Sequence, residues 1–432
     1  MSRTAPALEV PSQAPSFAFI AEAVGRAMEP RPAPPFVRGV TRIPLNVPTY
    51  GAPEVIETLD SMMSTWVTMG KKVRQFEEMW AAYVGVPTAL MVNSGSSANL
   101  LALSAMKACG WLKDGDEIIT PALTWATTVF PIAQVGCVPV LVDVDRDTYN
   151  ISPAAIERAI TPKTKAIMPV HLLGNPCDMG AIRFTAALRD LYIIEDACEA
   201  HGAEWRNQRA GSLGDVSTFS FFFSHHISTI EGGMVLGHHP DIMEACRSLR
   251  AHGWIREMEG KKRIAEENPD IDPRFLFAHA GYNFRPTEIQ GAFGIHQVPR
   301  LEGLVAHRRE VAAYWNQEFA PYQDWLLLPH ERPKTRHSYF AYPLQVRAGA
   351  PFTAKELQAH LEQWGVETRP IEAGNMAMQP AMKAVPHRAE PLPNAQYIHD
   401  NAFFFGCHQG VGFAEREAVA GYIHQFMKER GA

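Results

Sequence analysis

Short apolar runs alternate with amphipathic stretches between about residue 50 and residue 300. The runs have the length and composition of strands, and they span 88–92, 117–121, 138–144, 165–172, 191–197 and 217–223. Apolar positions at helical spacing lie between them, at 98–108, 153–159, 179–190 and 240–252. Apolar strands that alternate with helices are typical of a mostly parallel sheet covered on both faces. The pattern therefore predicts an α/β fold for this region.

A different pattern follows from about residue 305. It predicts a long helix at 303–319, then strands at 338–346 and 366–371 with a helix at 354–364 between them. This mixture indicates a smaller α+β domain.

The N-terminal segment up to about residue 40 is rich in proline and alanine, as in PSQAP and EPRPAPP. We expect an arm or flexible tail, helical at 17–28. The predicted organisation is an N-terminal extension at 1–40, a large domain at 41–300 and a small domain at 301–432.

Composition and charge exclude several classes of protein. With 46% hydrophobic and 20% charged residues, the 432-residue chain fits a soluble globular protein of two or three packed units. Its net charge of -6 gives no basic footprint for nucleic acid, and no apolar run is long enough to span a membrane. The N-terminus lacks the pattern of a secretory signal. We therefore expect a cytoplasmic protein.

Six cysteines are scattered singly along the chain, without a CxxC pair. They are Cys109, Cys137, Cys177, Cys198, Cys246 and Cys407. This spacing argues against a disulfide framework and against a zinc or iron–sulfur site. We expect no metal site.

Two motifs follow predicted strands and suit a flat, phosphorylated ligand. NSGSSAN, which contains Gly95 and Ser96, opens a helix with small residues, and a helix start binds phosphate well. Trp125 follows the strand at 117–121 and could stack on a ring. The alternatives are an ordinary serine-capped helix and a core tryptophan.

IIEDACEAHGA ends a strong apolar strand in acidic residues. Asp196 would lie at the carboxyl end of a parallel strand, where open α/β sheets bind ligands. A carboxylate there can keep a pyridine nitrogen protonated. A helix cap or a surface acid is the alternative reading.

The segment FSFFFSHHISTIEGG carries two adjacent histidines, His225 and His226. A histidine in a pocket can shuttle protons near neutral pH, whereas one structural and one exposed histidine would be the plainer interpretation. Anion contacts are possible from Asn283 in GYNFRP, Arg250 in LRAHGW and Arg369 in ETRP, and each of these residues could instead be solvated.

The order of these motifs carries more information than any one of them. SGSSAN, the tryptophan, EDACEAHG, SFFFSHHISTIEGG and GYNFRPTEIQ follow one another. From about Arg42 to the C-terminal region this order resembles the DegT/DnrJ/EryC1/StrS sugar aminotransferases, a family of fold-type-I pyridoxal 5′-phosphate (PLP) enzymes. The resemblance implies an aspartate aminotransferase-like large domain with a mostly parallel sheet, and a smaller α+β C-terminal domain.

His225 occupies the place where the resembled family carries a lysine, six residues before the EGG. No lysine occurs between Lys165 and Lys261. An imidazole cannot form the stable imine that a lysine forms with the cofactor aldehyde, so the cofactor would be held without a covalent bond. The histidine version resembles the sugar 3-dehydratases of the family, in particular the branch that acts on GDP-4-keto-6-deoxy-D-mannose.

A second dehydratase branch uses an iron–sulfur cluster and a reductase partner, with a cysteine-rich insert after the segment RAHGWIREMEGKKRIAEENPD. No cysteine lies between Cys246 and Cys407. This departure argues for the branch without a cluster.

The resemblance also implies roles for individual residues. The cofactor phosphate would be bound by Gly95, Ser96 and Ser220, and by Asn283 from the other subunit of a homodimer with shared active sites. Trp125 would stack on the ring, Asp196 would pair with its nitrogen and Glu199 would lie near its hydroxyl. His225 would be catalytic. The amino donor or the sugar nucleotide would contact Arg250, Arg369 and His226.

The implied function is a 3-dehydratase dependent on PLP and pyridoxamine phosphate. It would take an amino group from glutamate and remove the C3 hydroxyl of a 4-keto-6-deoxy hexose linked to GDP, without nucleic acid or membrane partners. One alternative is a nucleotide-sugar 4-aminotransferase that uses an unexpected lysine. The other is a non-catalytic PLP-fold protein, because loss of the lysine is also what a degenerate enzyme would show.

Overall fold

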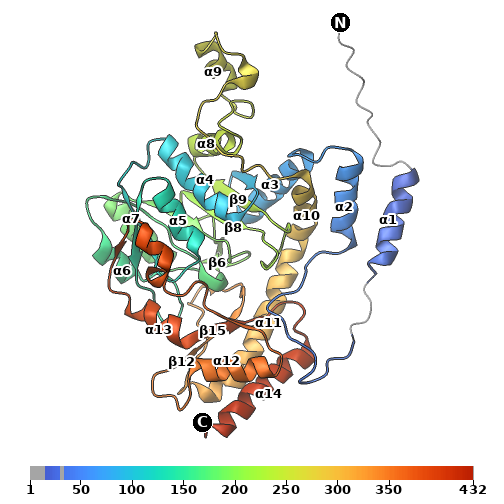
Figure 1. Ribbon diagram of the computed structural model, residues 1–432, viewed down its shortest axis with the longest axis vertical. Helices are drawn as coiled ribbons and strands as arrows, with labels where there is room; N and C mark the ends of the chain where they lie inside the picture. Colours follow the sequence, from blue (N-terminus) through green and yellow to red (C-terminus); the bar gives the residue numbers. More distant parts are fainter. Residues whose placement is uncertain (1–14, 30–33, 432) are drawn as a thin grey trace.

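An eight-stranded sheet forms the centre of the protein (Figure 1). The computed structural model describes residues 15–29 and 34–431. In spatial order the strands are β1 (Thr88–Val92), β9 (Gly233–Gly237), β8 (Val216–Ser220), β5 (Tyr192–Asp196), β4 (Thr164–Ile167), β2 (Glu117–Pro121), β3 (Val138–Val142) and β14 (Arg388–Ala389).

The central sheet is mostly parallel, as the sequence pattern predicts. All neighbouring strands from β8 to β14 run parallel, whereas β9 lies antiparallel to both β1 and β8. The expected strand at 217–223 is shorter in the structure, because the chain turns away after Ser220. The Phe221 N–H then donates to the Gly232 carbonyl, and Phe222 and Phe223 are exposed.

Helices cover both faces of the sheet, and alternate residues of one strand enter different cores. In β1, Leu90 and Val92 pack with α4 (Gly95–Ala108) and α8 (Pro240–Arg250). Ala89 and Met91 pack with α3 (Lys71–Val84) on the opposite face. The side-chain period of two in a strand explains why a strand buried on both faces has an uninterrupted apolar sequence.

Other helices complete the two layers around the sheet. They are α2 (Ala52–Met63), α5 (Ala126–Gln134), α6 (Pro153–Ala159), α7 (Met179–Arg189) and α10 (Glu288–Gln297). A small sheet of β6 (Glu204–Trp205), β7 (Gln208–Arg209) and β11 (Thr335–Arg336) lies beside them.

A second sheet lies toward the C-terminal end of the chain (Figure 1). Its antiparallel strands, in order, are β10 (Leu326–Leu327), β12 (Tyr342–Val346), β15 (Ala402–Phe405) and β13 (Thr368–Pro370). Its helices are α11 (Leu301–Phe319), α12 (Ala354–Gln363), α13 (Pro393–Asn401) and α14 (Phe413–Glu429).

Two segments cross between the two parts of the chain. Ile43 is buried in the C-terminal core and forms a bridge with Val366, and β14 returns from the C-terminal part to pair with β3. The domain division at residues 40 and 300 stays a prediction.

The helix expected at 17–28 is present as α1 (Pro15–Ala27), which packs on α2 at the outside of the molecule (Figure 1). The flexible tail expected before it falls largely on residues 1–14, which lie outside the described residues. Within 15–29 and 34–431, no helix has the length and apolar character needed to cross a membrane.

Candidate active site

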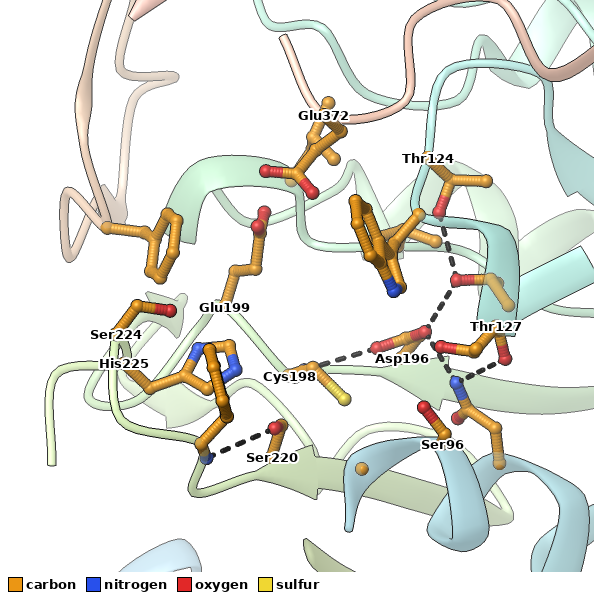
Figure 2. Close-up of a pocket in the computed structure, with 18 of the residues that line it drawn as sticks. Ser96, Thr124, Thr127, Asp196, Cys198, Glu199, Ser220, Ser224, His225 and Glu372 are labelled. Atoms are coloured by element: carbon orange, nitrogen blue, oxygen red, sulfur yellow. Dashed lines mark hydrogen bonds between the residues drawn. The ribbon is translucent and has the colours of Figure 1, made fainter. Parts of the chain in front are cut away.

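A cavity of about 570 Å³ opens at the carboxyl ends of β5 and β8. The starts of α4 and α5 line it from the large sheet, and the C-terminal part contributes Phe340, Arg369, Pro370, Glu372 and Phe404. Figure 2 shows acidic, hydroxyl and imidazole side chains that converge on this space. Ligands of open α/β sheets bind at this edge, so the cavity is where the sequence predicts a site.

Asp196, the last residue of β5, is held in place by three donors. Its Oδ2 accepts hydrogen bonds from Asn99 Nδ2 at 3.0 Å and from Thr128 Oγ1 at 2.8 Å, and its Oδ1 accepts from the Cys198 N–H at 3.2 Å. Asp196 is buried and lines the cavity, and none of the described residues forms a salt bridge with it. A buried carboxylate with this set of donors is ready to receive a cationic partner from a ligand.

The start of α4 forms one end of the cavity. Ser94 caps the helix, with its Oγ accepting from the Ser97 N–H at 3.1 Å, and Gly95 and Ser96 begin the first turn. A Cβ atom on Gly95 would lie 2.5 Å from the Cβ of Ser220, so only glycine lets the helix start approach the end of β8 this closely. The first N–H groups of a helix lack intrahelical partners and suit a phosphate.

Trp125 precedes α5 and lines the cavity. Its side chain is 57% exposed, which excludes the alternative that it is an ordinary core tryptophan. An aromatic face open to the cavity can stack on a planar ligand.

His225 lies in the loop between β8 and β9 and reaches the cavity wall (Figure 2). Its side chain is buried, and its Nδ1 is buried without a hydrogen-bond partner among the described residues. Burial, followed by the positive charge of Arg308, lowers the pKa of His225 to about 3. The imidazole is therefore neutral at physiological pH and can accept a proton. No lysine is among the described residues that line the cavity.

His226 is not directed into the cavity. Its Nε2 contacts the Ser338 carbonyl at 3.0 Å, and it does not line the cavity. The expectation that one of the two adjacent histidines would be exposed does not hold, because both are buried. His201 lies behind them, with its ring centroid 5.6 Å from that of His225 and 5.5 Å from that of His226.

Two glutamates face each other across the upper part of the cavity in Figure 2. Glu199 accepts a hydrogen bond from the Leu173 N–H at 2.7 Å, and Glu372 approaches from the C-terminal part of the chain. Burial and then the charge of Glu372 raise the pKa of Glu199 well above its usual value, and burial raises the pKa of Glu372. Like charges in one buried site disfavour double ionisation, which adds to the effect of burial and favours a proton on the pair.

Glu372 is a residue that sequence reasoning did not single out. Its backbone φ of 45° is in the left-handed region, which is strained for a residue other than glycine and is common at functional sites. The only signal was its place in ETRPIEAGN. The sequence patterns also do not single out Asn99, Thr128 and Cys198, although Asn99 lies in NSGSSAN, Cys198 in IIEDACEAHGA and Thr128 close to Trp125.

The arginines and Asn283 occupy different surroundings. Arg369 lines the cavity, but its Nη2 also lies 2.7 Å from Glu367. Arg250 does not line the cavity, because it is buried in an ion pair of 2.7 Å with Glu77 and donates to the Met91 carbonyl. Asn283 is exposed outside the cavity and accepts from the Arg285 side chain.

Residues 50–424 match the model of the DegT/DnrJ/EryC1/StrS aminotransferase family. The chain belongs to this family. The match covers the predicted resemblance, so both the family and the aminotransferase-type fold are confirmed.

The chain also resembles individual members of the DegT/DnrJ/EryC1/StrS family. It is 38% identical over 375 residues to the GDP-4-keto-6-deoxy-D-mannose 3-dehydratase of Yersinia pseudotuberculosis. The aligned residues make up 85% of this chain and 94% of the relative. The Escherichia coli enzyme of that name, solved with bound hydrated PLP, has a TM-score of 0.84 and 35% identity, covering 88% of this chain and 98% of that chain. A GDP-4-keto-6-deoxymannose-3-dehydratase structure with a trapped PLP-glutamate geminal diamine has the same TM-score and 34% identity. The alignment covers 88% of this chain and 99% of that chain.

Proposed function

We propose that this protein is a nucleotide-sugar 3-dehydratase that uses PLP and pyridoxamine phosphate. Glutamate is the amino donor, and the substrate is a 4-keto-6-deoxy hexose linked to GDP. The observation that carries the proposal is the imidazole of His225 at the wall of a cavity whose described lining contains no lysine. In a family of aminotransferases, a histidine in place of the lysine exchanges an amine, which forms a covalent bond with the cofactor, for an imidazole, which transfers protons.

The residues of the cavity fit the cofactor. Asp196 offers a buried carboxylate without a cationic partner among the described residues, and a protonated pyridine nitrogen supplies one. Gly95 and Ser96 present the start of α4 to the phosphate, and Trp125 offers an aromatic face to the ring. When bound, the cofactor supplies an amino group exchange with glutamate and an electron sink for bond cleavage at the sugar.

His225 carries the proton transfers. The lowered pKa of His225 keeps a ring nitrogen free at neutral pH, so the neutral imidazole would accept there the proton that the bound cofactor releases. As imidazolium it donates the proton to the C3 hydroxyl oxygen, which leaves as water. A pKa below neutral makes the imidazolium a strong acid for this second step and the imidazole a weaker base for the first.

The partners that we propose for the protein are inferred from the same site. Arg369 is the one arginine or lysine among the described lining residues, and it supports binding of the carboxylate of glutamate or of a part of the nucleotide sugar. We place Asn283 at the cavity of a second copy of the chain, in a homodimer with shared active sites. Its exposed position outside its own cavity supports this arrangement. We expect the enzyme to work in the cytoplasm.

The test is incubation of the purified protein with PLP, glutamate and GDP-4-keto-6-deoxymannose, beside the dTDP and CDP analogues. Loss of the C3 oxygen, read by mass, and release of ammonia are the expected results. An amino sugar as the sole product would instead establish a 4-aminotransferase, and no product with any analogue would favour a non-catalytic protein.

The matched variant is His225→Lys, which restores the amine that the family normally carries. Borohydride treatment should attach the cofactor covalently to this variant and not to the wild type. Covalent attachment to the wild type would show that an unexpected lysine serves the site and would overturn the role of His225.

A further inference from the structure

A third histidine, His201, packs against His225 on the side away from the cavity and has no role in the proton transfers described above. It follows β5 in the motif IIEDACEAHGA and is fully buried, with its ring centroid 5.6 Å from that of His225. It does not line the catalytic cavity. His201 can therefore influence the reaction only through a neighbour that does line the cavity, and His225 is such a neighbour.

The imidazoles of this cluster are neutral at physiological pH. Burial, followed by repulsion from His225, lowers the pKa of His201 well below its usual value. Burial and then the charge of Arg308 lower the pKa of His226 in the same way. A neutral imidazole has one N–H donor and one acceptor nitrogen. The ring nitrogen on which His225 carries its proton therefore decides which nitrogen can act as a base.

The two nitrogens of His225 have different surroundings. Its Nδ1 is buried without a hydrogen-bond partner among the described residues. The ring lines the cavity, so Nε2 is the nitrogen that is left to face a substrate. Nε2 can accept a proton only if Nδ1 carries the proton of the neutral ring, and a buried N–H group needs an acceptor. A neighbour of Nδ1 must therefore supply that acceptor.

His201 can be this acceptor. Both of its nitrogens are buried without a hydrogen bond of ordinary geometry among the described residues. The backbone of Ser220 lies beside the ring and acts to raise its pKa, as a carbonyl oxygen near a ring N–H does. With its N–H directed at Ser220, His201 has a lone pair left for His225. The rings of Phe219 and Phe221, with centroids 5.4 and 5.3 Å from that of His201, offer no hydrogen-bonding atom.

A competing donor lies beside the same ring. Trp80 Nε1 is also buried without a partner among the described residues, and the Trp80 ring centroid is 5.4 Å from that of His201. If Trp80 donated to the lone pair of His201, the N–H of His201 would be left to donate to His225 Nδ1. The proton of His225 would then lie on Nε2, which could not act as a base. The two arrangements therefore place this proton on opposite nitrogens, a difference that can be measured.

We infer that His201 is a positioning residue, which accepts the Nδ1 proton of His225 and so holds His225 in the tautomer whose Nε2 is free. That this tautomer serves the removal of a sugar hydroxyl rests on the proposed function. The tautomer itself is a property of the protein without substrate and can be observed directly.

The direct test is nitrogen NMR of the PLP-loaded protein labelled with isotopic histidine, in which His225→Asn assigns the signals of His225. In the wild type, Nε2 should have the chemical shift of an unprotonated nitrogen and Nδ1 that of an N–H. His201→Phe keeps a ring and removes the acceptor, so a measurable share of His225 should change to the Nε2–H tautomer. His226→Phe is the matched control, because the His226 ring is also buried and lies 5.5 Å from that of His201, but its Nε2 contacts the Ser338 carbonyl. The control should leave the tautomer unchanged.

The kinetic test separates positioning from a structural role. His201→Phe should lower kcat of the dehydration by about 10- to 100-fold, the usual effect of a group that orients a functional histidine, with KM and PLP retention unchanged. His201→Gln, whose amide oxygen can accept a hydrogen bond, should recover part of this loss.

The inference is overturned if His225 carries its proton on Nε2 in the wild type, which is the result expected if Trp80 is the donor to His201. It is also overturned if His201→Phe leaves the tautomer and kcat unchanged, or if His226→Phe lowers kcat as much. If no nucleotide sugar is dehydrated, the proposed function fails, while the NMR spectra still decide the role of His201.

Discussion

Replacement of Glu372 by glutamine should change how the stability of the protein depends on pH. The substitution keeps the size of the side chain and removes one member of the buried carboxyl pair. Glu199 then loses the neighbouring charge that helps to raise its pKa, although burial continues to raise it. The substitution therefore removes the repulsion between the two carboxyl groups together with the titration of buried Glu372, and it leaves only the effect of burial on Glu199.

The sign follows from proton binding. A glutamate in an unfolded chain releases its proton near pH 4.3, whereas the raised pKa values of Glu199 and Glu372 keep protons on the folded protein above that pH. The folded state then binds more protons than the unfolded state, so the free energy of unfolding falls as the pH rises from about 4.3 toward the folded pKa values. Below the unfolded pKa this contribution is fully present.

The size of the effect can be bounded. Two carboxylates at the separation of about 4–6 Å over which charges shift each other's pKa repel by about 3–4 kcal/mol at an effective dielectric constant of about 20. Between pH 5 and pH 8 the wild type should therefore lose about 1–3 kcal/mol more stability than Glu372→Gln.

The assay is denaturation of the cofactor-free protein at pH 5 and at pH 8. Glu78→Gln serves as the control, because Glu78 is exposed, does not line the cavity and forms no ion pair among the described residues, and it should behave as the wild type does. If the free energies of unfolding of the wild type and of Glu372→Gln fall by the same amount between pH 5 and pH 8, the carboxyl pair does not retain a proton. An equally reduced fall in the control variant would also contradict the prediction.

Three further predictions concern the site and its support. Asp196→Asn should weaken binding of PLP by about 10- to 100-fold, measured by absorbance after dialysis, because a charge-assisted hydrogen bond is lost; unchanged retention would contradict the pairing with the ring nitrogen. His225→Asn should lower turnover by about 10²- to 10⁴-fold, the usual contribution of a general base, whereas His226→Asn should mainly lower the melting temperature; equal losses of turnover would contradict the assignment. Arg250→Met should destabilise the protein by about 3–5 kcal/mol, since Glu77 would keep a buried charge without its partner; a change in KM without a fall in melting temperature would show that Arg250 contacts the substrate.

The sequence predicts the elements whose apolar pattern is local. The runs at 88–92 and 117–121 coincide with β1 and β2, and the helix at 153–159 coincides with α6. The strand β9 was missed because GMVLG is short and begins and ends with glycine, so its strand character depends on pairing with two strands that are distant in the sequence. Pairing between distant strands leaves little trace in a local pattern.

The same limit applies to the site. Asp196 could be found because a strong apolar strand ends there, whereas Glu372 reaches the cavity from a part of the chain 176 residues away. The sequence predicts that Arg250 contacts an anionic ligand. In the structure it pairs instead with the carboxylate of Glu77, which lies 173 residues earlier in the chain. Charge alone indicates that an arginine needs a partner but not whether that partner belongs to the protein or to a ligand.

The loop that carries His225 is anchored by two strands that pair along their whole length. Five residue pairs, from Val216 with Gly237 to Ser220 with Gly233, fix the distance between the ends of the loop. The core on either side of these strands does not depend on the side chain at position 225, so one residue can change there while the fold persists. Evolution of a new reaction on this scaffold therefore needs no new architecture, and related proteins with different chemistry can share it.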